Sequence, residues 1–167
     1  MSSTEGAPQG PDLTQGVALT DIPDGGSLLG HVGDDAVLLA RQGDELFAIG
    51  ATCSHYGGPL AEGAIVGDTV RCPWHHACFS LRTGEALRAP ALNPVACWKV
   101  ERAGDHVRVG EKVERDPLAA LGAAPQTAVR KVVIVGAGAA GTACAEMLRR
   151  LGFAGSITIV DDDEGSP

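Results

Sequence analysis

The sequence predicts a mainly β protein in which a small β-sandwich or barrel is followed by a linker and one β-α-β unit. Two patterns lead to this prediction. From residue 17 to residue 110, short apolar runs alternate with turn signals, which is typical of an all-β domain. From residue 130 onward, two apolar runs flank a glycine-rich turn and an amphipathic helical pattern. The chain of 167 residues has room for one ordinary domain or two small ones.

Composition and charge exclude several classes of function. Hydrophobic residues make up 44% of the chain and charged residues 20%, close to the globular norm, which argues against wholesale disorder. The net charge of −8 argues against nucleic acid and anionic membranes as partners. No apolar run approaches a membrane helix, and the first ten residues lack the pattern of a secretory signal. We therefore expect a cytoplasmic protein, whose five cysteines serve metal or thiol chemistry rather than disulfides.

The predicted β domain covers residues 11–110. The small, polar residues 1–10 before it are expected to form a disordered tail. Turn signals rich in Gly, Asp and Pro separate the apolar runs that we interpret as strands. The predicted strands lie at residues 27–29, 36–40, 46–49, 96–101 and 106–109.

The composition of the sequence changes after this domain. Residues 111–129 mix charge, Ala and Pro without a clear period, which favours an interdomain linker. Residues 132–135 form a continuous apolar run, typical of a buried parallel strand, and residues 157–160 form a second one. Between the two runs, Cys144 and its apolar neighbours recur at helical spacing. Residues 130–167 therefore spell β-α-β, a unit of roughly 35 residues that is too small to bury a core alone.

The pairs Cys53-Ser-His55 and Cys72-Pro-Trp-His75 form a metal-ligand pattern. Thiolate sulfur and imidazole nitrogen suit zinc or an iron–sulfur cluster. A structural zinc site is the alternative, although such sites usually combine a cysteine pair with a histidine pair. Here each segment supplies one cysteine and one histidine, which suits a two-iron cluster with both cysteines on one iron and both histidines on the other.

At these residues the sequence resembles the Rieske family. The resemblance extends from Val17 to Val109 and includes three segments beside the ligands, at residues 57–63, 78–84 and 88–91. It implies a small β-sandwich or barrel with a [2Fe–2S] cluster at its tip. It also implies that Cys53 and Cys72 hold the buried iron, and that His55 and His75 hold the outer iron near solvent.

Departures from high-potential members of the family favour a low-potential, ferredoxin-type domain. Gly58 and Trp74 stand where those members carry two further cysteines, so their disulfide cannot form here. Ala77 and Phe79 stand where those members place a serine and a tyrosine that donate hydrogen bonds to sulfur. Loss of these bonds lowers the potential. His76 occupies a position that is most often Gly in the family.

Aromatic residues concentrate beside the two ligand segments. Of the six aromatic residues in the chain, Tyr56, Trp74 and Phe79 lie in or next to these segments. We interpret them as a shield that excludes water from the cluster and tunes its potential. The alternative is that they only pack the loops.

A second motif, Gly136-x-Gly138-x-x-Gly141 with Asp161 further on, predicts dinucleotide binding. The glycines allow a tight turn, approach of a pyrophosphate to the backbone, and close packing of helix and strand, while the acid would bind ribose hydroxyls. The alternative is an Ala- and Gly-rich turn without a ligand. Residues 130–167 resemble the opening of apoptosis-inducing-factor-like flavoprotein reductases that carry an N-terminal Rieske domain. That resemblance implies FAD at this motif.

We therefore expect one-electron transfer through a low-potential [2Fe–2S] cluster in the N-terminal part of an FAD-dependent NAD(P)H oxidoreductase. The redox partner would be the flavin domain or a separate electron acceptor. Because the sequence ends after one β-α-β unit, we expect a fragment of a longer reductase that is inactive alone and does not hold FAD tightly. The alternatives are a zinc-stabilised binding domain and the ferredoxin component of an oxygenase system.

Overall fold

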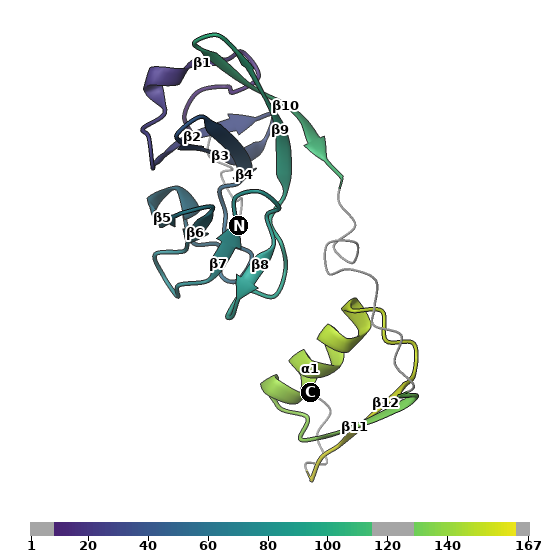
Figure 1. Cartoon of the computed structure of the whole chain (residues 1–167). Coiled ribbons are helices and arrows are strands. Elements are labelled where there is room, and N and C mark those ends of the chain that lie inside the picture. Colours follow the sequence, from purple (N-terminus) through teal and green to yellow (C-terminus); the bar gives the residue numbers. More distant parts are fainter. Residues whose placement is uncertain (1–8, 115–128, 163–167) are drawn as a thin grey trace, which may run out of the picture. The chain divides into compact units, whose positions relative to one another are not determined.

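A computed structural model describes residues 9–114 and 129–162, which fall into two compact units, Met1–Glu114 and Arg115–Pro167 (Figure 1). Most of the predicted tail (residues 1–8), most of the predicted linker (residues 115–128) and residues 163–167 lie outside the described residues. None of the helices in the described ranges has the length and hydropathy required to cross a membrane.

The described chain is built mainly of strands, as the sequence predicts. In unit 1 the elements are β1 (Val17–Ala18), η1 (Leu19–Asp21), β2 (Ser27–Val32), β3 (Asp35–Gln42), β4 (Glu45–Gly50), η2 (Leu60–Glu62), β5 (Ala64–Val66), β6 (Thr69–Arg71), β7 (Cys78–Ser80), β8 (Ala86–Arg88), β9 (Cys97–Ala103) and β10 (His106–Val113). In unit 2 they are β11 (Lys131–Val135), α1 (Ala139–Arg150) and β12 (Ser156–Val160).

Unit 1 contains two antiparallel sheets. The larger sheet has six strands in the order β1-β10-β9-β4-β3-β2, and the smaller has four in the order β5-β6-β7-β8. Most neighbours are hairpins, but β4 pairs with β9 and β1 pairs with β10, so the last two strands close onto the first ones. β10 continues to Val113, past the predicted domain end at residue 110.

Strand β3 shows how the chain builds two cores from one sheet. Residues 37–40 are all buried, because both faces of this strand are covered. Leu38 and Ala40 belong to a cluster that includes residues of the smaller sheet, whereas Val37 and Leu39 belong to a second cluster closed by β9 and β10. A continuous apolar run is the pattern expected of a strand buried on both sides.

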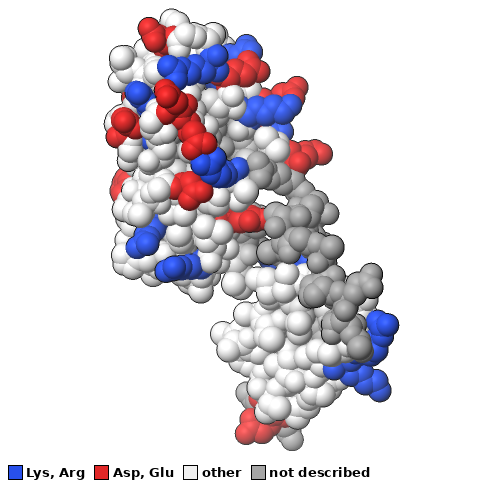
Figure 2. All heavy atoms as spheres, viewed as in Figure 1, with Lys and Arg blue, Asp and Glu red and all other residues white. Residues whose placement is uncertain are grey.

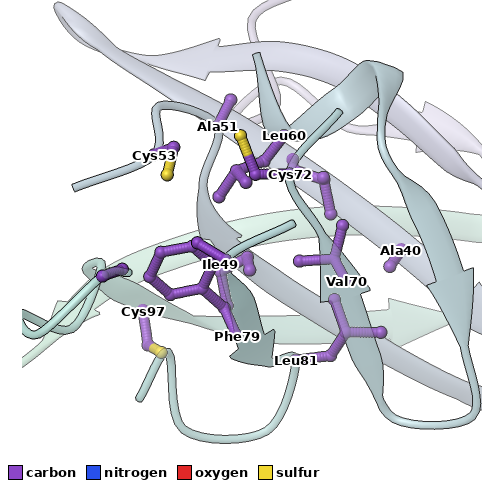
Figure 3. Close-up of a cluster of buried hydrophobic side chains, with 13 residues drawn as sticks. Ala40, Ile49, Ala51, Cys53, Leu60, Val70, Cys72, Phe79, Leu81 and Cys97 are labelled. Atoms are coloured by element: carbon purple, nitrogen blue, oxygen red, sulfur yellow. The ribbon is translucent and has the colours of Figure 1, made fainter. Parts of the chain in front are cut away.

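The first of these clusters is the one that positions the candidate site. It joins Ile49 of β4 to Val70 of β6 and Phe79 of β7, and it also contains Cys53 and Cys72 (Figure 3). At the rim of the same region the Arg82 guanidinium bonds to Glu45 at 2.6 Å and to Asp68 at 3.1 Å, which links the two sheets. The cysteines therefore lie in the layer where the two sheets meet.

Unit 2 is the predicted β-α-β. β11 and β12 pair in parallel, with Val135 opposite Val160, and α1 connects them. None of the residues of α1 is buried, and Cys144, which the periodicity places on the apolar face, is exposed. Val133 and Val135 are 63% and 87% exposed. One helix and two strands thus leave much of their apolar surface uncovered, as the small size of the unit predicts.

We expect the amides of residues 130–160 to exchange with deuterium at close to the unprotected rate, because a two-stranded ladder with exposed apolar side chains opens at little free-energy cost. The amides of β3, β4 and β9 are the internal control, since each of these strands is paired along both of its edges in the six-stranded sheet. Hydrogen-exchange mass spectrometry of the whole chain measures both regions together. Slow exchange across β11 would show that unit 2 is stable by itself.

Candidate metal centre

Two loops of matching backbone geometry carry the four candidate ligands. In the first, the N–H of Cys53 donates to the carbonyl of Gly58 at 2.8 Å and the N–H of Gly57 donates to the carbonyl of Cys53 at 2.9 Å. In the second, Cys72 donates to the carbonyl of Ala77 at 2.9 Å and His76 donates back to Cys72 at 3.1 Å. Each loop therefore folds back on its cysteine through the same pair of bonds, and each presents its histidine beyond the sulfur.

The two cysteines form a buried sulfur pair. Cys53 and Cys72 are 3% and 2% exposed and belong to the same cluster (Figure 3). Burial raises the pKa of Cys53, although the backbone N–H groups of His55 and Tyr56 donate to its sulfur and act in the opposite direction. The neighbouring Cys72 thiol also raises the pKa of Cys53. Because burial favours the neutral thiol, a bound metal is what would allow this pair to lose its protons.

The two histidines form a second pair. The ring centroids of His55 and His75 are 5.1 Å apart, and the ring planes meet at 88°. His55 is half-buried and His75 is exposed. The Nδ1 atom of His55 is buried and has no hydrogen-bond partner among the described residues. A buried ring nitrogen is rarely left without a partner, so this nitrogen is available to coordinate a metal.

These donors fit a two-iron cluster better than a single metal ion. Within residues 9–114 and 129–162, no three His, Cys, Asp or Glu side chains gather around one point as a mononuclear site requires. The structure instead provides a sulfur pair and a nitrogen pair. A [2Fe–2S] cluster with two cysteines on one iron and two histidines on the other uses such a set.

Gly58 leaves space for the sulfur of Cys72. A Cβ atom at this position would lie 2.6 Å from the Sγ atom of Cys72 and 3.2 Å from the ring of Trp74. The first loop can therefore approach the second only because this residue has no side chain. This close approach gives a physical reason for the glycine that the sequence comparison with high-potential proteins singled out.

His76 is the one described non-glycine residue with a positive φ, at 59°. Gly57 occupies the matching position of the first loop with a φ of 73°. The left-handed backbone at residue 76 is thus real, and a histidine there costs about 1–2 kcal/mol relative to an unstrained residue. Its side chain is exposed, and no hydrogen bond, ion pair or ring contact joins it to another described residue.

The interpretation of the aromatic residues as a water-excluding shield is wrong for two of the three. Phe79 is fully buried beneath the loops, but Tyr56 is 73% exposed and Trp74 is 55% exposed. The Tyr56 ring lies 4.7 Å from that of His55 and 6.0 Å from that of His75. The Tyr56 ring therefore borders both histidines, Trp74 precedes His75 in the second loop, and both rings face solvent.

A third loop supports the first in a way that sequence reasoning missed. The hydroxyl of Ser54 donates to the carbonyl of Asn93 at 2.5 Å, and the buried Ala91 belongs to the same cluster as the cysteines. The only signal was the proline-bearing segment at residues 88–91, which the resemblance assigned to this loop. Nothing in the sequence linked it to Ser54.

The predicted dinucleotide motif is assembled in unit 2. Gly136 has a φ of 101°, and a Cβ atom at Gly141 would lie 1.9 Å from the carbonyl oxygen of Gly136, so the turn requires glycine at both positions. Gly138 caps α1, with open space around its Cα. The N–H of Gly136 donates to Val160 at 2.7 Å, which brings the following Asp161 next to the turn.

Comparison with known proteins decides the family of unit 1. Residues 16–99 match the protein family described as "Rieske [2Fe-2S] domain". This chain belongs to the Rieske family. It is 37% identical to the biphenyl 2,3-dioxygenase ferredoxin component of Rhodococcus jostii (strain RHA1), over 58% of this chain and 91% of that protein.

Two further relatives bear on fold and length. The ferredoxin of carbazole 1,9a-dioxygenase from Nocardioides aromaticivorans IC177 superposes with a TM-score of 0.54 at 29% identity, over 56% of this chain and 92% of that ferredoxin. "Apoptosis-inducing factor 3" of Homo sapiens is 36% identical over 146 residues, or 82% of this chain and 24% of that protein. The chain thus spans about a quarter of the length of this last relative. Unit 1 has the mainly β Rieske fold that the sequence predicts.

We expect replacement of His76 by Gly to raise the melting temperature by a few degrees, because Gly adopts a φ near 60° without strain. Thermal unfolding followed by circular dichroism measures the shift. Gly57→Ala, which meets no atom within 4 Å, is the matched reverse change and should lower the melting temperature. A destabilised His76→Gly variant would mean that the histidine contributes contacts that outweigh its backbone strain.

Proposed function

We propose that unit 1 transfers single electrons through a [2Fe–2S] cluster held by Cys53 and Cys72 on one iron and by His55 and His75 on the other. The observation that carries this proposal is the arrangement of the four donors as a buried sulfur pair and an outer nitrogen pair. When bound, such a cluster accepts and releases one electron at a time. The ferredoxin components among the relatives support the same role.

Each protein group has a defined part in this function. The buried sulfurs of Cys53 and Cys72 hold the cluster at the layer where the two sheets meet. The exposed ring of His75 makes a short route for the electron to a partner.

The potential is proposed to lie toward the low end of the Rieske range. Ala77 and Phe79 are fully buried beside the second loop and offer no side-chain donor to a sulfur. Residues 11–110 carry 7 Lys and Arg against 12 Asp and Glu, a net charge of −5 that disfavours the uptake of an electron.

The finer proposal is that this domain forms the N-terminal part of an FAD-dependent NAD(P)H oxidoreductase. A match covering 82% of the chain to apoptosis-inducing factor 3 cannot be confined to the 114 residues of unit 1. The turn formed by Gly136, Gly138 and Gly141, with Asp161 beside it, has the backbone that a pyrophosphate needs. FAD at this turn is supported by resemblance and by its order in the chain.

A second candidate function is that of an oxygenase ferredoxin component. The observation that favours it is the 91% of the Rhodococcus ferredoxin that is matched at 37% identity. Reduction by NADH or NADPH without an added reductase, measured on the full-length product of the gene, distinguishes the two. A separate reductase requirement would favour the ferredoxin role.

The protein expressed with iron–sulfur assembly is expected to contain two irons and two acid-labile sulfides per chain, with the absorption and electron paramagnetic resonance of a Rieske cluster. Cys72→Ala should abolish both, because one iron loses one of its two cysteine ligands. Cys97→Ala removes an equally buried thiol from the same cluster of side chains and should retain the iron. One zinc and no sulfide would establish the zinc-stabilised alternative instead.

Introducing a donor beside the second loop should raise the reduction potential. Ala77→Ser is expected to shift it upward by about 20–60 mV, the effect of a new hydrogen bond of about 0.5–1.5 kcal/mol on a one-electron couple. Protein-film voltammetry measures the shift. Ala48→Ser, also buried but in the other core, is the control and should leave the potential in place. A wild-type potential above about +150 mV would contradict the low-potential proposal.

A further inference from the structure

Exposed aromatic residues occur only on the two candidate-ligand loops. All six aromatic residues lie in the described chain, and the two that are exposed are Tyr56 in the first loop and Trp74 in the second. The Tyr56 ring borders both histidines, and Trp74 lies next to His75 in the chain, so each ligand loop exposes one aromatic ring to solvent. Aromatic side chains that stay exposed at one place are typical of the centre of a protein contact.

Two arginines of unit 1 stand apart from the other basic residues. The side chains of Arg71 and Arg88 are exposed and form no hydrogen bond or ion pair with other described residues. Arg41 donates to backbone carbonyls. Ion pairs with carboxylates engage the remaining Lys and Arg of residues 9–114, which are Arg82, Lys99, Arg102, Arg108 and Lys112. Figure 2 shows this difference on one face, where basic and acidic side chains mix over the upper part of unit 1 and basic ones stand alone toward its lower end.

Strand register places both arginines at the base of the second ligand loop. Arg71 is paired with Cys78, and Cys78 is paired with Arg88, across the adjacent strands β6, β7 and β8 (Figure 1). Paired Cα atoms lie about 4.5–5.5 Å apart in such a ladder. The chain between Arg71 and Cys78 is the loop that carries Cys72, Trp74 and His75. The unpaired positive charges therefore flank the same loop as the exposed ring of Trp74.

We infer that Tyr56, Trp74, Arg71 and Arg88 form a docking face for an acidic surface on the redox partner protein. The inference rests on the proposed electron-transfer function and names the chemistry of the partner at that site. A chain of net charge −8 repels an acidic protein over most of its surface. Arg71 and Arg88 provide the local attraction through which carboxylates approach His75.

The nearby acids indicate how such a partner is oriented. Asp34 and Glu62 line an open groove of about 430 Å³ that includes Gly57 of the first loop, and no residue of the second loop is among its described lining. Negative charge thus lies beside the first loop and positive charge beside the second. The carboxylates of the partner lie over Arg71 and Arg88, and they avoid the groove.

Small oxidants of opposite charge test the local charge of this face. The reduced holoprotein is mixed in a stopped-flow instrument with hexacyanoferrate(III), a trianion, or with hexaammineruthenium(III), a trication, at about 0.01 M ionic strength. Arg71→Gln and Arg88→Gln are each expected to slow the trianion about three- to five-fold and to accelerate the trication, as follows from a unit charge about 10 Å from the reacting ion. The ratio of the two rates separates charge from any change in driving force.

Arg102→Gln is the matched control, because it removes the same charge from the far end of β9. Residue 102 is five residues along the strand from Cys97, or about 16 Å, so this variant should change each of the two rates about two-fold or less. Equal effects of the three variants would overturn the docking face while leaving the proposed function intact. A wild-type protein without iron and sulfide would overturn the proposed function, and the inference with it.

Discussion

The burial of two cysteine sulfurs side by side in the core between the two sheets is the constraint on which the rest of unit 1 depends. Cys53 and Cys72 belong to the cluster that joins the larger sheet to the smaller one. Burial raises the pKa of Cys53, so thiolates at this place need a metal to balance them. The smaller sheet has only short strands, and a cluster that ties its ligand loop to the larger sheet would stabilise both. We therefore expect metal binding and folding to be coupled in this domain.

The two ligand loops form the same pair of backbone hydrogen bonds but differ in the residues at the matching positions. Each loop returns to its cysteine through a left-handed residue, Gly57 in the first and His76 in the second. Gly58 then allows the first loop to reach the Cys72 sulfur, a contact that any larger residue would block. The histidine at residue 76 satisfies the same geometry at a cost, and nothing within the described chain offsets that cost.

Local pattern predicted the parts of the fold that depend on neighbours in sequence. Turn signals separated β2, β3 and β4, and the ligand spacing identified Cys53, His55, Cys72 and His75 as a set. The pairing of β4 with β9 joins segments some fifty residues apart and leaves no local trace. The end of β10 at Val113 was missed because charged residues alternate along an exposed edge, which looks like a linker.

Side-chain exposure at the site was the other property that sequence could not supply. Aromatic residues near a metal suggest shielding, because most aromatic rings are buried, and only the backbone of the loops shows that Tyr56 and Trp74 face outward. Ion pairing could not be predicted either, since nothing in the sequence around Arg71 and Arg88 distinguishes them from arginines that form ion pairs. That these two side chains lack a carboxylate partner is seen only once the ion pairs of the other basic residues of unit 1 are known. An acidic domain that keeps two free cations beside its redox site can attract an acidic partner at one place and repel it elsewhere. This arrangement favours orientation and rate over tight binding.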